Sequence, residues 1–461
     1  MPNDLRIELT SFRAVKQATI LLDGITVLAG ENGSGKSTIS KLLYTTLKVS
    51  REYDEIMEKN SQQRIQSILS GVRSVVKDYS FLIEDNKQTV LDEFKLLEKV
   101  DPLNLVNASD ADNQLKIYEQ IIQGVVSGFE INSSFDQLKA NLYFKESVNH
   151  IERIKKNLLS RLPEYRNPDM PELSISAIFN LIRDSINTVQ SHFIGLTNQR
   201  PLSELNRRIA RQFDNDGTPI DYNLFEFDTP LINSDIDRLF LVQSIEKAVY
   251  IDTPMALGVG AVGRNDHWAE LHKLLLSESD DNLLDSDSGL LGISSEQIIN
   301  GSAFVDRKDL FRSQFKFKRD DGVEFNLLEC ATGVKSFSIL QILLKNGVLN
   351  DRSFLIIDEP EAHLHPQWIV EYARFLVLLN KHAGVKLLLA SHNPDMVSAL
   401  KYIAEKENNA NILNFYLAEK EPNDFTYTYK HLGVDVEEIF NSFNKSYEKL
   451  DAYAGQSDLQ Q

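Results

Sequence analysis

Cysteine is almost absent from this sequence, since Cys330 is the single one among 461 residues. One cysteine excludes an internal disulfide framework and fits a reducing compartment. The sequence also lacks a run of about 18 apolar residues, the length that a membrane-spanning helix requires. Its first residues, Met-Pro-Asn-Asp, lack the basic stretch and apolar segment of a signal peptide. These absences predict a cytoplasmic protein with no membrane partner.

Basic residues are too few to balance the acidic ones, so the net charge is −18. Binding to nucleic-acid phosphates requires clustered lysine and arginine, so the charge does not favour DNA as a partner. Short basic stretches such as Arg153–Lys156 are interpreted as solvated faces, although DNA binding stays open as an alternative. The content of 42% hydrophobic and 25% charged residues is typical of a globular protein of two or three domains.

The sequence pattern divides the chain into two α/β blocks separated by a helical insertion. Residues 1–50 show alternating apolar positions typical of strands, followed by a helix. Residues 51–235 are rich in Gln, Asn, Lys, Glu and Leu with helical periodicity, and they are interpreted as the insertion. Mixed structure is predicted over residues 236–330, and the second α/β block over residues 331–435. A C-terminal helix and a polar tail are expected over residues 436–461.

The segment Gly30–Ser37 matches the phosphate-binding pattern GxxxxGK[ST]. A predicted strand before it and a helix after it argue against the alternative of a chance glycine turn. Its glycines let backbone N–H groups approach phosphate oxygens, and the helix N-terminus favours negative charge. Lys36 is expected to reach the β- and γ-phosphates, and the Ser37 hydroxyl to bind Mg²⁺. The predicted nucleotide contacts in this segment are Asn32, Gly33, Ser34, Gly35, Lys36, Ser37 and Thr38.

A pair of carboxylates follows a second apolar strand. Residues 353–357 are the strand, and Asp358 and Glu359 come directly after it. Polar groups at the carboxyl end of a buried strand lie where ligands bind in open α/β sheets. Asp358 is therefore expected in the Mg²⁺ shell, directly or through water, and Glu359 is expected to polarise the attacking water.

His392 follows a further apolar strand, Val385–Ala390, in the same manner. A single histidine is more often structural than catalytic. Its position at the tip of a strand that neighbours the one ending in Asp358 favours a hydrogen bond to a γ-phosphate oxygen.

The segment Ala331–Lys335 precedes a predicted helix and contains small residues and one glycine. Such a helix N-terminus can face a phosphate, and Ala331, Thr332, Gly333 and Lys335 are therefore candidate nucleotide contacts. The alternative is an ordinary helix cap in which Thr332 and Gly333 only begin the helix.

These motifs, in this order, resemble an ABC-type ATPase head of the RecF/SMC/OLD group. The resemblance implies an α/β fold, a P-loop NTPase head with a mixed sheet flanked by helices and a mainly helical insertion. It implies ATP and Mg²⁺ as cofactors, with Lys36, Glu359 and His392 as catalytic residues. The Ala331–Lys335 segment would reach the γ-phosphate across a dimer. The opening strand resembles that of RecF-like proteins and adds Arg13 to the expected nucleotide contacts.

The chain departs from the family pattern at two motifs. Ala331–Lys335 keeps only the small residues, the glycine and the lysine of the usual signature, which implies slow ATP turnover. Residues 361–366, EAHLHP, resemble OLD-like and bacterial defence ATPases rather than transporters. The glutamine that senses Mg²⁺ in the family is not identified. A GxGxxG match at Gly258–Gly263 lacks a strand-to-helix context and is interpreted as a loop.

About 40 residues follow the last predicted head strand, too few for a nuclease domain. The chain therefore resembles the ATPase subunits of two-gene anti-phage systems such as the PARIS and Septu types. That resemblance implies a homo-oligomer that senses a phage-derived trigger and controls a separate effector, a TOPRIM-like or HNH nuclease. A RecF/SMC-like DNA-repair ATPase is the alternative, and a transporter ATPase is disfavoured by the weak signature.

Overall fold

The computed structural model describes most of the chain, and the helices and strands below lie within the described residues. These are residues 5–80, 92, 95–96, 107–132, 140–160, 162, 173–214, 220–233, 236–258, 266–277, 298–307, 314–422 and 424–444. The GxGxxG match at Gly258–Gly263 lies largely outside them. No helix in this part of the chain is long and apolar enough to cross a membrane.

The chain divides into two compact units. The sheet unit comprises Met1–Arg51 and Pro201–Gln461, and the helical unit comprises Glu52–Arg200. The helical insertion therefore ends earlier than residue 235, the end that its composition predicts. Residues 222–232 form two strands of the large sheet instead, because Leu5–Leu9 of the first strand pair with Tyr222–Glu226.

The sheet unit is built on a ten-stranded mixed sheet with the order β5-β4-β1-β2-β13-β12-β3-β11-β10-β6. Parallel pairing joins β12, β3, β11, β10 and β6, and antiparallel pairing dominates from β5 to β2. This mixed sheet flanked by helices confirms the predicted fold class. The strands are β1 Leu5–Phe12, β2 Val15–Leu21, β3 Ile25–Ala29, β4 Tyr222–Glu226, β5 Thr229–Ile232, β6 Lys247–Ile251, β10 Ser353–Asp358, β11 Lys386–Ser391, β12 Leu413–Lys420 and β13 Tyr427–Gly433.

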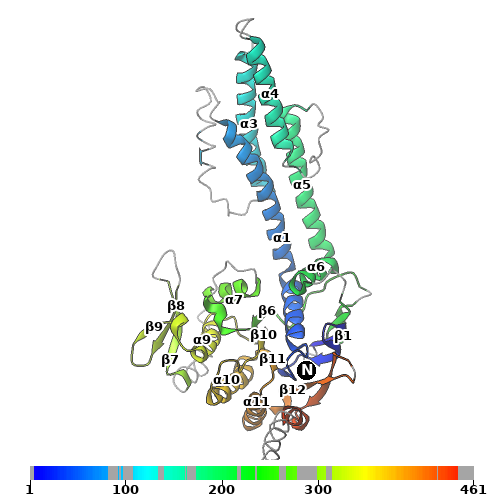
Figure 1. Ribbon diagram of the computed structural model, residues 1–461, viewed down its shortest axis with the longest axis vertical. Coiled ribbons are helices and arrows are strands. Elements are labelled where there is room, and N and C mark those ends of the chain that lie inside the picture. Colours follow the sequence, from blue (N-terminus) through cyan, green and yellow to red (C-terminus); the bar gives the residue numbers. More distant parts are fainter. Residues whose placement is uncertain are drawn as a thin grey trace, which may run out of the picture. The chain divides into compact units, whose positions relative to one another are not determined.

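The central strands are apolar through most of their length, as is typical of parallel strands covered by helices on both faces. All residues of β3 and β10 are buried. Alternate residues of β3, β10 and β11 pack with α9, α10 and α11 in one hydrophobic core. Tyr250 of β6 points to the other face, where its ring lies 5.5 Å from that of Tyr44 in α1. Figure 1 shows α9, α10 and α11 beside these strands.

The helices of the sheet unit begin and end with recognisable signals. His365 and Asn393 cap α10 and α11, and a proline opens each helix. Gly384 ends α10 in the left-handed conformation that glycine favours. The helices are the start of α1 Lys36–Ser80, then α6 Leu202–Phe213, α7 Asp266–Leu276, α9 Thr332–Lys345, α10 Pro366–Ala383, α11 Pro394–Lys406 and the short η3 Pro254–Gly258, η6 Leu327–Glu329 and η7 Ala410–Ile412.

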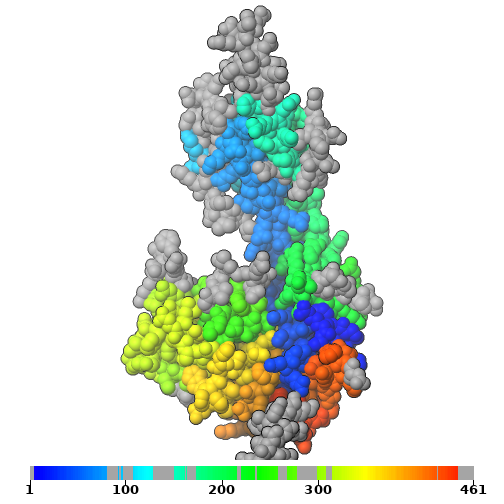
Figure 2. Space-filling view, viewed as in Figure 1, coloured from blue at the N-terminus to red at the C-terminus, as the bar shows by residue number. Residues whose placement is uncertain are grey.

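A small antiparallel sheet precedes α9. It consists of β7 Gly301–Asp306, β8 Gln314–Arg319 and β9 Glu324–Asn326, in that order. Phe315 and Phe317 of β8 point into the same core as α9. In the large sheet β13 pairs with β2, and Figure 2 shows orange atoms from the C-terminal part of the chain beside blue atoms from its N-terminal part. The P-loop strand β3 itself pairs with β11 on one side and β12 on the other, both from distant parts of the sequence.

The helical unit has a hydrophobic core of its own. It contains the rest of α1 together with α3 Ala108–Asn132, α4 Ala140–Leu159 and α5 Ile175–Gln199. Ile178, Phe179 and Ile182 of α5 are fully buried against residues of α1 and α3. Arg183 ties α5 to α3, with Nε 3.0 Å from an oxygen of Asp112 and Nη2 2.7 Å from one of Glu119. The apolar core shared by these helices, together with the ion pairs of Arg183, therefore holds the helical unit together.

Phe179→Ala should destabilise the helical unit by about 3–5 kcal/mol, because it leaves a cavity in this core. The matched control is Asn187→Ala on the exposed face of the same helix. Hydrogen exchange should show faster exchange of the amides of α3 and α5 in the first variant and unchanged rates in the second. Equal exchange in the two variants would contradict the packing described for α5.

Candidate active site

The predicted site residues meet at one edge of the large sheet because their strands run parallel. In the pairing register Ala29 lies opposite Ser391, and Ala390 lies opposite Asp358. The loop after β3, the carboxylates after β10 and the histidine after β11 therefore leave the sheet side by side. The structure brings together the P-loop, Asp358, Glu359 and His392 as the sequence predicts.

The loop from residue 30 to residue 35 requires glycine at two positions for steric reasons. A Cβ on Gly35 would lie 2.6 Å from Val15 Cγ2, and the residue has a φ of 93°. A Cβ on Gly30 would lie 2.8 Å from the Cβ of Ala418 on β12. The loop is therefore wedged between β2 and β12, so that its backbone is held in one conformation.

Lys36 opens α1 with its amine folded back over the loop. Its Nζ donates to the carbonyl oxygens of Gly30, at 2.8 Å, and Glu31, at 2.9 Å. Burial lowers the pKa of this amine, while the carboxylates of Glu359, Glu361 and Asp358 act in the opposite direction. A buried cation ringed by backbone oxygens and carboxylates is placed to attract a phosphate into the loop.

Asp358 has the surroundings of a magnesium ligand. Burial raises the pKa of this carboxyl, and the hydroxyls of Tyr250, Ser40 and Ser37 oppose that effect. Among the residues that the structure describes, no hydrogen-bond partner reaches the buried Oδ1 of Asp358 or the buried Oγ of Ser34 in the loop. A buried oxygen that lacks a partner is costly unless a ligand satisfies it. An orphaned carboxylate oxygen near the Ser37 hydroxyl fits Mg²⁺, which takes one or two carboxylates plus substrate phosphates.

The metal site does not depend on a dense ligand cluster. Within the described ranges, no group of three or more His, Cys, Asp or Glu could hold a metal ion. Asp358 and Ser37 would hold Mg²⁺ together with phosphate oxygens, and the ion would supply neutralisation of the phosphate charge. The site therefore fits the ion only in company with a nucleotide.

Tyr250 is a positioning residue that the sequence did not indicate. Its hydroxyl donates to Oδ2 of Asp358 at 2.7 Å, so that the other carboxylate oxygen, Oδ1, is left for a ligand. A hydrogen bond of this kind to a metal-binding side chain fixes the orientation of that side chain. The sequence predicted only mixed structure over residues 236–330, because the pairing of β6 with β10 is what brings Tyr250 to Asp358.

Asp252 follows β6 at the edge where Asp358 follows β10. Its Oδ1 accepts from Nε1 of Trp268 at 2.7 Å, and its Oδ2 lies 2.9 Å from Nε2 of His267. Burial works to raise the pKa of Asp252, but hydrogen bonds from His267 and Trp268 outweigh it and lower the pKa. Asp252 therefore fixes the first turn of α7 beside the site. The residue that follows β6 is this aspartate and not the Mg²⁺-sensing glutamine that the family resemblance implied.

Glu359 leaves β10 with a strained backbone. Its φ is 50°, in the left-handed region, and its N–H donates to Ala390 O at 2.8 Å. A non-glycine residue in this region costs about 1–2 kcal/mol and persists where the surroundings impose it. Its side chain is 48% exposed, with Oε1 3.8 Å from His392 Nδ1. Glu359 is thus open to the space above the sheet edge, where a water molecule can be held.

Glu361 is a second residue that sequence reasoning did not assign. It is buried, and its Oε1 accepts from Ser391 Oγ at 3.0 Å and from the His392 N–H at 2.9 Å. The same oxygen lies 3.3 Å from His392 Nδ1. Burial raises the pKa of Glu361, and the bonds from His392 and Ser391 oppose that rise. Glu361 therefore fixes the tip of β11, and its signal in the sequence was the EAHLHP segment.

The remaining predicted P-loop contacts lie at the rim. Asn32 and Ser37 are exposed, and Thr38 is half-buried in the first turn of α1. The Arg13 side chain donates to Phe213 O and stacks 5.0 Å from the ring centroid of Phe213. Its chain neighbour Ala14 lies next to Gly35, so Arg13 belongs to a segment that borders the loop.

The Ala331–Lys335 segment begins α9 at another place in the sheet unit. A Cβ on Gly333 would lie 2.5 Å from Trp368 Cε3 of α10, so close packing alone requires glycine there. Lys335 is buried, and Ala331 makes no side-chain cap. Figure 1 shows α9 beside the small sheet, on the opposite side of the sheet unit from β12 and β1. The segment thus opens α9 at the side of the sheet unit where the small sheet lies, and Gly333 serves the packing of α9 on α10.

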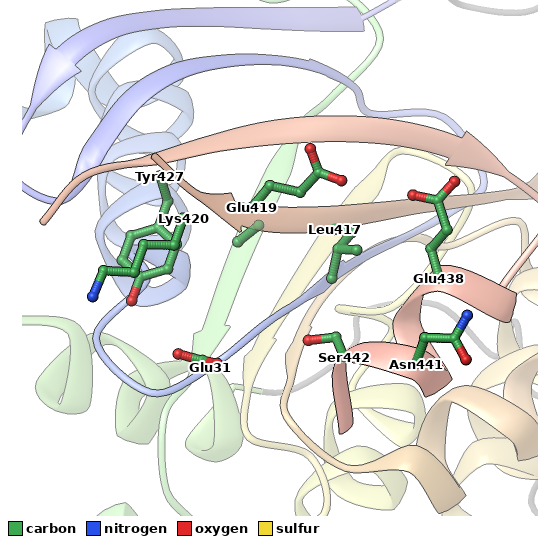
Figure 3. Close-up of a pocket in the computed structure, with 9 residues that line it drawn as sticks. Glu31, Leu417, Glu419, Lys420, Tyr427, Glu438, Asn441 and Ser442 are labelled. Carbon is green, nitrogen blue, oxygen red and sulfur yellow. The ribbon is translucent and has the colours of Figure 1, made fainter. Parts of the chain in front are cut away.

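A pocket of about 360 Å³ opens beside the P-loop, on the side of β12 and β13. Figure 3 shows Glu31 of the loop on one side of the pocket, Lys420 of β12 above it, and Glu438, Asn441 and Ser442 on the helix at 437–444 on the other side. Three carboxylates and one lysine line the pocket, so its lining carries a net negative charge. The P-loop pattern, with Lys36 at the start of α1, places the phosphates on the other side of the loop.

The P-loop between β3 and α1, the carboxylates at the end of β10 and the mixed sheet flanked by helices define a P-loop ATPase domain. Residues 25–398 match the family described as "AAA domain, putative AbiEii toxin, Type IV TA system". This match spans most of the chain, and the chain belongs to that family. None of the curated proteins compared with the chain matches it.

Solved structures similar to the chain include SMC heads. The Smc head with an extended coiled coil bound to the C-terminal domain of ScpA, from Pyrococcus furiosus, is 11% identical over 98% of this chain and 100% of that one, with a TM-score of 0.34. The Smc head with a coiled coil and joint from Pyrococcus yayanosii is 10% identical over 97% and 100%, with a TM-score of 0.35. The SMC head of Thermotoga maritima is 12% identical over 46% and 64%, with a TM-score of 0.25.

Asp358→Asn should stabilise the protein without ligand and remove its stabilisation by ATP and Mg²⁺. Burial raises the pKa of this carboxyl, so its charge costs stability as pH rises above the ordinary value of about 3.9 towards the raised one. At neutral pH thermal unfolding should show a higher Tm for the free variant and no further rise with ATP and Mg²⁺. Asp320→Asn, in an exposed turn, should behave as the unchanged protein. If ATP and Mg²⁺ raise the Tm of Asp358→Asn as much as that of the unchanged protein, Asp358 is not a ligand of the metal ion.

Glu361→Ala should lower kcat for ATP hydrolysis by about 10–100-fold, the usual cost of losing a group that orients a reacting residue. KM for ATP should change by less than about threefold, because the P-loop contacts are unaltered. Glu361→Gln keeps an oxygen that can accept from Ser391 and His392, and it should restore most of kcat. Equal losses in the two variants would show that the negative charge, rather than the positioning of His392, matters.

Proposed function

We propose that this chain is an ATP-hydrolysing, self-associating ATPase that controls a separate effector protein in anti-phage defence. The observation that carries the ATPase part is the sheet edge where Lys36, Asp358, Glu359 and His392 converge. The family description, with its toxin and type IV toxin–antitoxin terms, supports the defence part. The two parts rest on different grounds and are tested separately.

Each residue of the edge has a distinct task in hydrolysis. The loop N–H groups and Lys36 bind and orient the phosphates. Ser37 and Asp358, oriented by Tyr250, would hold Mg²⁺. Glu359 polarises a water molecule for attack on the γ-phosphate, and its exposure leaves room for that water. His392, fixed by Glu361, donates to a γ-phosphate oxygen as negative charge develops.

Self-association would bring the Ala331–Lys335 segment of one chain to the P-loop of another. This proposal is supported by the separation of α9 from the P-loop edge within one chain. It is also supported by apolar side chains that are exposed just before α9, namely Val323, Phe325 and Leu328 at 44%, 38% and 42%. Burial of such a patch stabilises association. ATP would then act as the bridge that closes the dimer.

Control of an effector would follow from this closure. The helical unit adds a surface that ATP binding does not require, and partners of the ATPase are proposed to bind there. The effector is proposed to be a nuclease, released or activated when a phage-derived trigger acts on the complex. DNA binding is the competing function, and the net charge of −18 opposes it.

Glu359→Gln should bind ATP and accumulate as a closed oligomer, because the attacking water is no longer polarised. Native mass spectrometry of the tagged variant, isolated from its host with ATP and Mg²⁺, should show an oligomer with bound ATP and a second, nuclease-sized protein. Lys36→Ala, which loses the phosphate-binding amine, should remain free of nucleotide and unassembled. If Glu359→Gln hydrolyses ATP at the normal rate, Glu359 is not the residue that polarises the attacking water. A bare dimer that retains DNA would replace the defence function with the DNA-repair one.

A further inference from the structure

A groove runs between two helices of the helical unit. Residues on one face of α1 and one face of α5 line it, the start of α3 lies at its end, and its volume is about 380 Å³. All of these residues belong to the Glu52–Arg200 unit. The lining positions recur at three- and four-residue intervals, so each helix presents a continuous stripe to the groove.

The floor of the groove is apolar and reaches the surface. Ile65 and Phe193 are buried at its base, whereas Ile194 is 54% exposed. An exposed isoleucine beside a hollow that large is a typical anchor point for an apolar side chain of a partner.

The rim contributed by α1 is acidic. Asp54, Glu55 and Glu58 line the groove, and none of the lining residues is lysine or arginine. Asp54 is paired with Arg200 at 2.9 Å, but Glu55 and Glu58 have no cationic partner among the described residues. The opposite rim, from α5, carries neutral amides such as Gln190 and Asn198. The Arg64 guanidinium of α1 stacks 5.3 Å from the Phe193 ring centroid, so the open apolar part of the groove centres on Ile194, and Glu55 and Glu58 make the α1 rim negative.

The size of the groove fits one short helix. The stretch of α1 from Asp54 to Ile65 is about 16 Å long, which corresponds to about three helical turns. A helix laid between α1 and α5 would extend the packing that already joins these helices. An extended segment would leave its backbone N–H and C=O groups facing side chains, without a strand edge to pair with.

We propose that this groove binds a basic amphipathic helix of a partner protein. Aliphatic side chains of that helix would fill the hollow over Phe193 and Ile194, and its lysines or arginines would face Glu55 and Glu58. The inference deepens the proposed function, because it gives the place and the chemistry by which an effector would dock. Charge complementarity would also raise the association rate at low salt.

The probe is a stapled helical peptide of about 12 residues, with leucines on one face and lysines along one edge. Fluorescence anisotropy should show binding to the full chain that weakens with salt. The same peptide with glutamates in place of lysines should not bind. The double variant Glu55→Lys and Glu58→Lys should bind the lysine peptide with an affinity at least about tenfold lower. The separate variant Ile194→Asn should show a loss of affinity of the same size.

The matched control is Glu152→Lys combined with Asp184→Lys, which makes the same charge change at two exposed positions outside the groove. It should bind the peptide as the unchanged protein does. Photocrosslinking from the peptide should label residues within 54–65 and 190–198. Absence of binding, an equal loss in the control, or labelling elsewhere would each overturn the proposal.

The peptide experiment is independent of ATP turnover. All groove variants should hydrolyse ATP at the rate of the unchanged protein, because none of the altered residues belongs to the sheet edge. Loss of peptide binding with intact hydrolysis would refute the groove alone. Peptide binding in a chain that neither hydrolyses ATP nor assembles would instead refute the proposed function.

Discussion

The parallel pairing of β3, β11 and β10 is the constraint on which the site depends. Their register places Ala29, Ser391 and Asp358 at one sheet edge, from segments more than 300 residues apart in the chain. A shift of one residue in either pair would turn the polar tips to the opposite face. The apolar side chains of these strands, packed with α9, α10 and α11, hold that register. The hydrophobic core therefore sets the chemistry of the edge.

The edge concentrates groups that are unfavourable in the protein without ligand. Asp358 and Glu361 are buried carboxyls, Lys36 is a buried amine, and Glu359 has a left-handed backbone. Lys36 is held by backbone oxygens, and Tyr250 satisfies only one oxygen of Asp358. A phosphate and a divalent cation would satisfy the others. Such preorganised charge is what a site for phosphoryl chemistry requires, because it stabilises developing charge without rearrangement.

The two units divide the tasks of the chain. The sheet unit supplies the edge for nucleotide chemistry, and its core is independent of the apolar cluster of the helical unit. The helical unit carries an acidic groove with an apolar base. Part of the net charge of −18 is thus placed where a basic partner can use it, which gives the acidity of the chain a function besides solubility.

The sequence by itself determined the fold class and the polar tips, because a P-loop and two apolar strands that end in polar residues are local patterns. It could not determine the limit of the helical insertion, since the strands at 222–232 exist only through their pairing with β1. It also missed Tyr250 and Glu361, whose positions depend on contacts between strands. The glycine of the Ala331–Lys335 segment illustrates the same limit: its packing against Trp368 is a contact between helices that no spacing records. Local patterns fix which residues can act, and long-range packing decides which of them meet.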